Sequence, residues 1–325
     1  MTRHDAGPAT ETLCPGAGAR PGPVATVLEA RDVPLGGLRA MTVRRSLPQR
    51  RLTTIGAWCF LDRFGPQDAV MRVEPHPHMG LQTVTWPLAG EIRHRDSLGS
   101  DVVLRPGALN LMTAGHGVAH SEYSVGDSPI PLDALQLWVA LPEEARHGAA
   151  GFESHATLPT VPLGDRATAT VILGELAGVV SPATAYTPIV GAQLTLEPGA
   201  RATLPLDRAW EHGLVPVAGD LGVADGAGTL PTPPEGGILY LGTDRDAVTL
   251  TSDAGATVVL LGGEPFPDDL VMWWNFIARD HDEIVAAWHA WNGDDGRFGT
   301  VPGHDAMRIP APPMPEVRLK PRRRG

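Results

Sequence analysis

Residues 76–86 read HPHMGLQTVTW, and this stretch decides the fold. Two histidines stand two positions apart at its start, and a β-strand places residues i and i+2 on the same face. The proline between them has a fixed φ and disfavours helical geometry at the residue before it. The sequence therefore predicts an extended segment that projects His76 and His78 from one side.

Residues 114–122, about forty positions further on, read AGHGVAHSE. His120 and Glu122 have the same two-residue spacing, so a strand presents them together as well. Three neutral imidazoles and one carboxylate suit a divalent ion such as Fe, Mn, Co, Ni, Cu or Zn. We therefore predict a metal site with four ligands: His76, His78, His120 and Glu122. The alternative for either pair is a solvated polar strand face, and the presence of both pairs favours the metal.

Short apolar runs separated by turn residues extend on both sides of these motifs. The chain has 38 glycines and 32 prolines among its 325 residues, with 42% hydrophobic and 19% charged residues. Such runs fill a first region from residue 26 to about 141, and the same rhythm returns from about 167 to 265. This rhythm is typical of β-sandwiches and barrels, so we predict an all-β protein with two tandem β units.

Three segments outside these units are expected to differ from them. Residues 1–24 are rich in Pro, Gly, Ala and Thr and predict a disordered leader. Residues 142–166 become Pro-rich and predict a linker that crosses the surface. Residues 310–325 combine prolines with basic residues, which predicts an extended and mobile Pro-rich basic tail.

One short helix is readable before that tail. Asp280 and Glu283 have the spacing of a capping box, with Asp in the place of Ser or Thr. Apolar residues then recur on one helical stripe, at Ile284, Ala287, Trp288 and Trp291. Asn292-Gly293 favours a left-handed stop after them. We expect a C-terminal helix whose apolar stripe packs on the core.

Charge and cysteine content limit the possible partners. The formal net charge is −11, and five of the positive charges lie in the last eight residues, so the rest of the chain is more acidic still. Such an acidic body is unsuited to wrapping nucleic acid, which requires a basic surface. Two cysteines, Cys14 and Cys59, are too few for a disulfide framework. The sequence lacks an 18-residue apolar run and a signal-peptide core. We expect a cytoplasmic protein that binds neither nucleic acid nor membrane directly.

Further motifs accompany the two histidine pairs in a fixed order. They are VRRSLP at 43–48, FLDRFGP at 60–66, MTAG at 112–115, GGEP at 262–265 and MWWNF at 272–276. Together with HPHMGLQTVTW and HSE, they resemble the pirins, a family of the cupin superfamily. The resemblance covers about residues 26–310 and is specific, because several ordered motifs match.

The resemblance implies a bicupin, with two tandem jelly-roll-like β-barrels in one chain. It implies one mononuclear iron, as Fe(II), in an N-terminal domain over residues 25–141, and a C-terminal domain over 167–309 that binds no metal. The family's ligands, carried over to this chain, are the four residues that the spacing nominates. Gln82 stands where pirins often have Glu, so the carboxylate ligand is expected from Glu122. His212, in the second domain, has no HxH partner.

Four other polar or reactive residues have weaker signals. His94, in IRHRDS at 92–97, is expected on a surface turn rather than at the mouth of a pocket. His116 either orients a substrate or water or is an ordinary loop residue, and both remain open. Cys59 is expected to be a small buried hydrophobe rather than a reactive thiol. Asp62 is expected to be a turn residue.

The resemblance implies two functions of different kinds. One is a dioxygenase that cleaves quercetin, or a related flavonol or enolisable phenol, with O2. Glu122 would then be the catalytic base that takes the proton of the substrate hydroxyl. The alternative is a non-enzymatic, iron-dependent redox sensor that binds a protein regulator, since a change in iron charge alters the local field. A third hypothesis is a metal-free cupin that binds or isomerises a sugar nucleotide.

Overall fold

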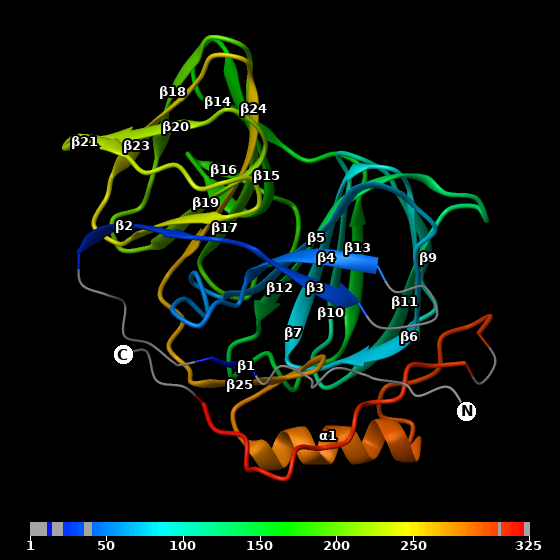
Figure 1. Ribbon diagram of the computed structural model, residues 1–325. Coiled ribbons are helices and arrows are strands. Elements are labelled where there is room, and N and C mark those ends of the chain that lie inside the picture. Colours follow the sequence, from blue (N-terminus) through cyan, green and yellow to red (C-terminus); the bar gives the residue numbers. More distant parts are fainter. Residues whose placement is uncertain (1–11, 15–21, 36–40, 305–306, 322–325) are drawn as a thin grey trace.

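The computed structural model describes residues 12–14, 22–35, 41–304 and 307–321 (Figure 1). Within these ranges the chain forms 26 strands and one helix, α1 (His281–Gly293). The strands make two β units side by side, and α1 lies against the first of them. The predicted all-β bicupin with a short C-terminal helix is therefore confirmed. No helix in the described part of the chain is long and apolar enough to span a membrane.

The first unit consists of two antiparallel sheets that face each other. The larger has the order β13-β10-β7-β12-β5-β4-β3, and the smaller has the order β6-β11-β8-β9. The larger sheet comprises β3 (Arg31–Leu35), β4 (Met41–Leu47), β5 (Trp58–Ala69), β7 (Leu81–Ala89), β10 (Leu109–Thr113), β12 (Ile130–Ala140) and β13 (Gly151–His155). The smaller comprises β6 (Arg72–His78), β8 (Ile92–Asp96), β9 (Asp101–Leu104) and β11 (Val118–Ser124). A hydrogen bond from Thr85 to Glu122 joins their inner faces.

The second unit repeats this plan. Its larger sheet has the order β14-β15-β17-β24-β19-β22-β2, with β16 paired to β15, and its smaller sheet has the order β18-β23-β20-β21. The larger sheet comprises β2 (Pro23–Leu28), β14 (Thr160–Pro162), β15 (Ala167–Leu176), β16 (Val179–Val180), β17 (Ile189–Leu196), β19 (Glu211–Gly219), β22 (Ile238–Gly242) and β24 (Ala256–Gly263). The smaller comprises β18 (Ala200–Pro205), β20 (Gly222–Asp225), β21 (Gly228–Leu230) and β23 (Ala247–Ser252). A separate small sheet contains β1 (Thr12–Cys14), β25 (Leu270–Trp273) and β26 (Phe276–Ala278).

A shared apolar core joins the two units. It combines Leu61, Val84 and Leu137 of the first unit with Val215 and Val259 of the second. Strands β5, β7 and β12 are therefore covered on both faces, because one face lines the interior of the first unit and the other meets the second unit. This double burial explains why nearly all residues in the central parts of these strands are buried, polar ones included, rather than every second one.

Polar contacts fix the junction between the units. The Arg63 side chain is 5% exposed and donates to both carboxylate oxygens of Asp133 and to the carbonyl of Val217. The Trp58 indole donates across the junction to the carbonyl of Val190, at 3.0 Å. Buried donors that find partners in the other unit give the junction a specific geometry in addition to apolar area.

The division between the units differs from the predicted ranges. Strand β2 pairs with β22, so a strand near the start of the chain belongs to the second unit. The predicted linker at 142–166 contains β13, which extends the first unit, and β14, which pairs with β15 in the second. In the predicted leader, β1 pairs with β25; residues 1–11 and 15–21 lie outside the described residues. Pairing to sheet edges satisfies backbone groups without a local apolar signal, so composition alone missed these strands.

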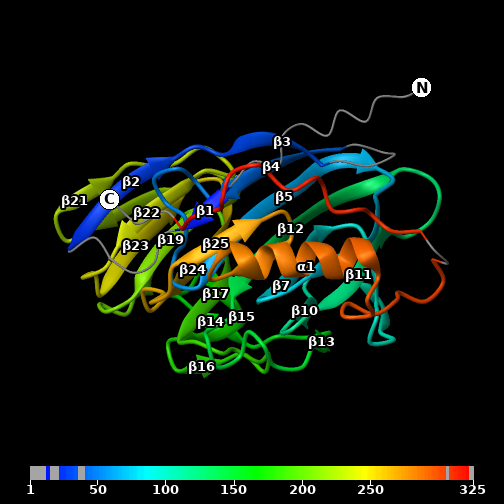
Figure 2. The ribbon, with the colours of Figure 1, turned by 90° about the horizontal axis from the view of Figure 1, so that it is seen from below.

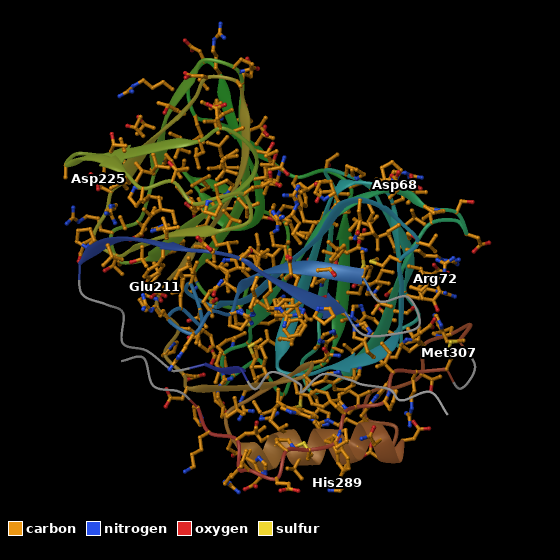
Figure 3. All side chains as sticks on the ribbon, viewed as in Figure 1. Asp68, Arg72, Glu211, Asp225, His289 and Met307 are labelled. Carbon is orange, nitrogen blue, oxygen red and sulfur yellow. The ribbon has the colours of Figure 1, made fainter. Side chains whose placement is uncertain are left out.

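The helix begins where its capping signal predicts. The Asp280 carboxylate accepts from the backbone amide of Glu283, at 3.0 Å, and the predicted stripe residue Trp291 is 2% exposed. Its end differs from the prediction by one residue. Gly293 remains helical, and the left-handed residue is Asp294, at φ 56°. Figure 3 shows His289 on the side of α1 that faces away from the sheets.

Residues 307–321 are extended, as predicted, but they are packed rather than mobile. This segment, here called the C-terminal arm, runs beside α1 (Figure 2). The indoles of Trp288 and Trp291 donate to the carbonyls of Pro312 and Ile309, at 2.7 and 2.8 Å. Leu319 is 2% exposed and belongs to the apolar cluster of α1. Proline-rich backbone has no internal hydrogen bonds, so its carbonyls are available to these indoles. Residues 322–325 lie outside the described residues.

We expect that Leu319→Ala releases the C-terminal arm from α1. The lost burial of a leucine side chain weakens docking by about 2 kcal/mol or more, which corresponds to at least a tenfold faster amide exchange in the arm. Hydrogen–deuterium exchange of residues 307–321 measures this. Val317→Ala is the matched control, because Val317 is 59% exposed in the same arm. Equal exchange in the two variants would contradict the docking described above.

Candidate metal centre

Neighbouring strands β6 and β11 bring three of the predicted ligands together. In their antiparallel ladder His120 lies opposite His76, and Val118 lies opposite His78. The ring centroids of His120 lie 4.4 Å from His76 and 5.0 Å from His78. Candidate ligand atoms of the three rings all lie within 4.8 Å of one another. All three are buried, with at most 7% of each residue exposed.

Hydrogen bonds fix the ring nitrogens that are left to bind an ion. The Nδ1 atom of His76 lies 2.9 Å from the carbonyl of Glu74, and that of His78 lies 3.2 Å from the carbonyl of Asn275. A carbonyl only accepts, so both Nδ1 atoms carry the proton and both Nε2 atoms have a lone pair. The Nε2 atom of His120 is buried and has no hydrogen-bond partner among the residues that the structure describes.

The electrostatics of this group suit a cation. Burial lowers the pKa of His76 to about 4, and burial together with the neighbouring histidines lowers the pKa values of His78 and His120 well below the ordinary range. The three imidazoles are therefore neutral at pH 7 and present lone pairs. Three neutral, buried nitrogens around an unsatisfied His120 Nε2 fit a divalent transition metal.

Glu122 lies beside His120 but not in simple register with it. A bulge between the two residues shifts the ladder, so that Glu122 lies opposite Val73 of β6. Its Oε1 atom accepts from the Thr85 hydroxyl at 2.9 Å, and burial raises the pKa of its carboxyl group. Its ligand atoms lie within 4.8 Å of those of His120 and His94. The structure thus groups Glu122 with His120, on the side of His94.

His94 is not on a surface turn, so that prediction is wrong. It lies on β8, is 2% exposed, and has its Nε2 atom 3.1 Å from Asp96 Oδ2. Its Nδ1 atom lies 3.3 Å from Nδ1 of His120. In the structure Ile92, His94 and Asp96 are buried and alternate with the more exposed Arg93 and Arg95. A polar strand that faces a polar interior has no apolar periodicity, so it reads as a turn.

Four other residues are singled out in the sequence: Cys59, His116, Gln82 and Asp62. Cys59 is fully buried, and His116 lies on the loop before β11 with its side chain exposed. Gln82 is fully buried and donates to Thr113 and to the carbonyl of Thr184 in the chain segment that leads into β17. Asp62 is a strand residue rather than a turn residue, and it accepts two hydrogen bonds of 2.7 Å from Arg45.

His212 is 2% exposed on β19, with a pKa that burial lowers to about 4. Among the described residues, it joins no group of three metal-ligating side chains.

Comparison with known proteins agrees with this geometry. Two facing-sheet units with a histidine cluster in the first define a bicupin. Residues 40–139 match the Pirin family, and residues 191–299 match the Pirin C-terminal cupin domain. The chain belongs to the pirin family.

Relatives cover most of the chain. A Pseudomonas aeruginosa protein, whose name gives it as a candidate quercetin 2,3-dioxygenase, is 43% identical over 88% of this chain and 89% of its own length. A pirin-like protein of Caulobacter vibrioides is 34% identical over 85% of this chain and 98% of its own. The crystal structure of a quercetin 2,3-dioxygenase from Acinetobacter baumannii is 36% identical, with a TM-score of 0.83 over 91% of this chain and 98% of that one.

We expect the metal-free protein to lose stability as the pH falls from 6.5 towards 4. In this window the unfolded chain protonates His76, whose unfolded pKa is about 6.5, whereas the folded chain does not, because burial lowers that pKa to about 4. The loss from His76 between pH 7 and pH 5 is on the order of 2 kcal/mol. Urea unfolding at both pH values measures it. His76→Gln should reduce the pH dependence by that amount, and an unchanged dependence would refute the assignment.

Proposed function

We propose that the protein is an iron-dependent dioxygenase that cleaves quercetin, or a related flavonol or enolisable phenol, with O2. The observation that carries this proposal is the group of three neutral, buried imidazoles with Glu122 beside it. We propose His76, His78, His120 and Glu122 as the ligands of Fe(II). The similarity to a quercetin 2,3-dioxygenase across nearly the whole chain supports the choice of reaction.

The wall that faces the histidines supports an aromatic, hydroxylated substrate. Two rows of side chains cross the inner face of the larger sheet of the first unit. Cross-strand pairs define a polar row of Arg45, Asp62, Gln136, Thr85 and Asn110. They also define a second, largely apolar row of Phe60, Trp138, Thr83, Met112 and Phe152.

The second row places aromatic faces near the metal ligands. The rings of Phe60 and Trp138 stack at 4.0 Å, and Trp138 contacts His78 edge-on at 5.1 Å. Aromatic side chains offer favourable stacking to a planar ring system.

The polar row contains an amide that lacks a partner within the described residues. Asn110 is 2% exposed, and neither its Oδ1 nor its Nδ2 atom has a hydrogen-bond partner. Buried amides normally have partners, because an unsatisfied one costs about 1–3 kcal/mol. We propose that the Asn110 amide hydrogen-bonds a hydroxyl or carbonyl group of the substrate.

Glu122 has the position and the chemistry of a proton acceptor. When bound, the iron would supply a Lewis acid for the substrate oxygen and an electron source for O2. Thr85 Oγ1 lies 2.9 Å from Glu122 Oε1 and 3.1 Å from Gln136 Oε1. Because one hydroxyl has one proton, Thr85 donates to Glu122 when the Gln136 amide is turned to donate to Thr85. These hydrogen bonds from Gln136 through Thr85 hold one carboxylate oxygen of Glu122, while Glu122 takes the proton of the substrate hydroxyl.

The first prediction of this proposal concerns iron and oxygen together. The purified protein should contain near-stoichiometric iron and consume O2 when quercetin is added, and His76→Ala/His78→Ala should lose both. Elemental analysis and an oxygen electrode, used on the same samples, measure these. Iron without uptake would favour a redox sensor or another substrate, and absence of any metal would refute the site.

Glu122→Gln separates the base from the other ligands in the same assay. This change keeps the size of the side chain and removes its capacity to accept a proton at neutral pH. We expect turnover to fall by about 100-fold or more, the scale of general-base catalysis. A variant with full iron and full turnover would show that Glu122 is not the base.

The Asn110 amide is tested by a separate variant. Asn110→Ala should weaken anaerobic quercetin binding to the iron-loaded protein by about tenfold, the effect of one lost hydrogen bond. A quercetin analogue that lacks the contacted hydroxyl should bind wild type and variant alike. Absorbance titration measures both affinities. Asn292→Ala is the control, since that amide bonds the C-terminal arm on α1. Unchanged quercetin affinity in Asn110→Ala would exclude this contact.

A further inference from the structure

A buried line of polar groups stands behind one of the three histidines. The Nδ1 atom of His120 lies 3.3 Å from Nδ1 of His94, and Nε2 of His94 lies 3.1 Å from Oδ2 of Asp96. All three residues are at most 2% exposed. The pairing of β8 with β11 builds this line, because Asp96 lies opposite His120 and His94 lies opposite Glu122.

The hydrogen-bond partners determine where the protons lie. Asp96 Oδ1 accepts from the backbone amides of Leu98 and Ser100, at 2.9 and 3.0 Å, so the carboxylate is held as an acceptor. It therefore accepts a hydrogen bond from the protonated Nε2 of His94, which leaves a lone pair on His94 Nδ1. That lone pair accepts from Nδ1 of His120. The remaining nitrogen of His120, the unpartnered Nε2, then has its lone pair free for a metal.

The ring of His94 is held in this orientation from a second side. It stacks on Phe152 of the larger sheet at 4.5 Å, with an interplanar angle of 16°. The other two histidines have no comparable support, since Nδ1 of His76 and of His78 each faces a neutral backbone carbonyl. Among the three, and within the described part of the chain, only His120 is therefore connected to a buried carboxylate.

We propose that Asp96 and His94 are positioning residues that act through His120 on the metal. They fix the tautomer of His120 and make its Nε2 atom a stronger electron-pair donor to the metal, because negative charge behind an imidazole raises its basicity. The stronger donor favours the more highly charged Fe(III) over Fe(II) and increases affinity for any divalent ion. This inference rests on the proposed role of His120 as a ligand, but not on quercetin as the substrate.

Asp96→Asn is the sharpest test. The Asn oxygen can keep both backbone amides, and its NH2 group then faces His94 Nε2, so His94 must accept there and carry its proton on Nδ1. That proton would oppose the one on His120. We expect Co(II) affinity, measured by chelator competition, to fall 10- to 100-fold. The midpoint potential of the iron-loaded protein should rise by about 59 mV for each tenfold loss of preference for Fe(III).

Two further variants keep the test decisive. His94→Gln can still accept from His120 but has no carboxylate behind it, so it should fold, bind Co(II) better than Asp96→Asn and still show a raised potential. Glu211→Gln is the matched control, because Glu211 is a fully buried carboxylate of the second unit that accepts from Gly56 and Tyr240. It should change neither affinity nor potential.

The possible results separate this inference from the proposed function. Wild-type affinity and potential in Asp96→Asn and His94→Gln would overturn it, as would equal losses in Glu211→Gln. Two metal equivalents per chain would also overturn it, because His94 would then be a ligand together with His120 and Glu122. Metal binding with the expected shifts in Co(II) affinity and midpoint potential, but without oxygen uptake on quercetin, would reject the proposed substrate. It would leave the positioning role of Asp96 and His94 in place.

Discussion

The site depends on the ladder between β6 and β11, which forces three imidazoles into the interior of the first unit. Burying such groups costs free energy unless their nitrogens find partners. Backbone carbonyls satisfy Nδ1 of His76 and His78, and His94 satisfies Nδ1 of His120. The partner of His76 lies on β6 itself, that of His78 in the turn between β25 and β26, and that of His120 on β8. The smaller sheet and the β25–β26 hairpin are therefore both needed for one small cluster.

The second unit shows the same arrangement without this demand. Its smaller sheet has the order β18-β23-β20-β21, which parallels β6-β11-β8-β9 in the first unit. Where β11 buries His120 and Glu122, the corresponding β23 buries Val248 and Leu250. The two units thus differ in the chemistry of one inner face. An apolar interior is stabilised by packing of the unit's own two sheets, whereas a polar interior requires hydrogen bonds or a ligand.

Local spacing was sufficient for the features that depend on near neighbours. The HxH and HxE pairs, the two β units and the cap at Asp280 all follow from residues a few positions apart. The errors concern partners that are distant in sequence. Asp62 reads as a turn residue because nothing near it shows that Arg45 lies across the ladder. His94 reads as a surface residue because only the fold shows that its strand faces other polar groups.

The contact between His78 and Asn275 also has a consequence for biosynthesis. His78 and His120 lie in the first half of the chain, yet the carbonyl that orients His78 follows almost the whole second unit. Ribosomes deliver the chain from the N-terminus, and domains fold as they emerge. The histidine cluster of the first unit therefore has all its hydrogen-bond partners only after residue 275 has been synthesised. His78 is thus oriented for the proposed metal only at the end of translation or in the released protein.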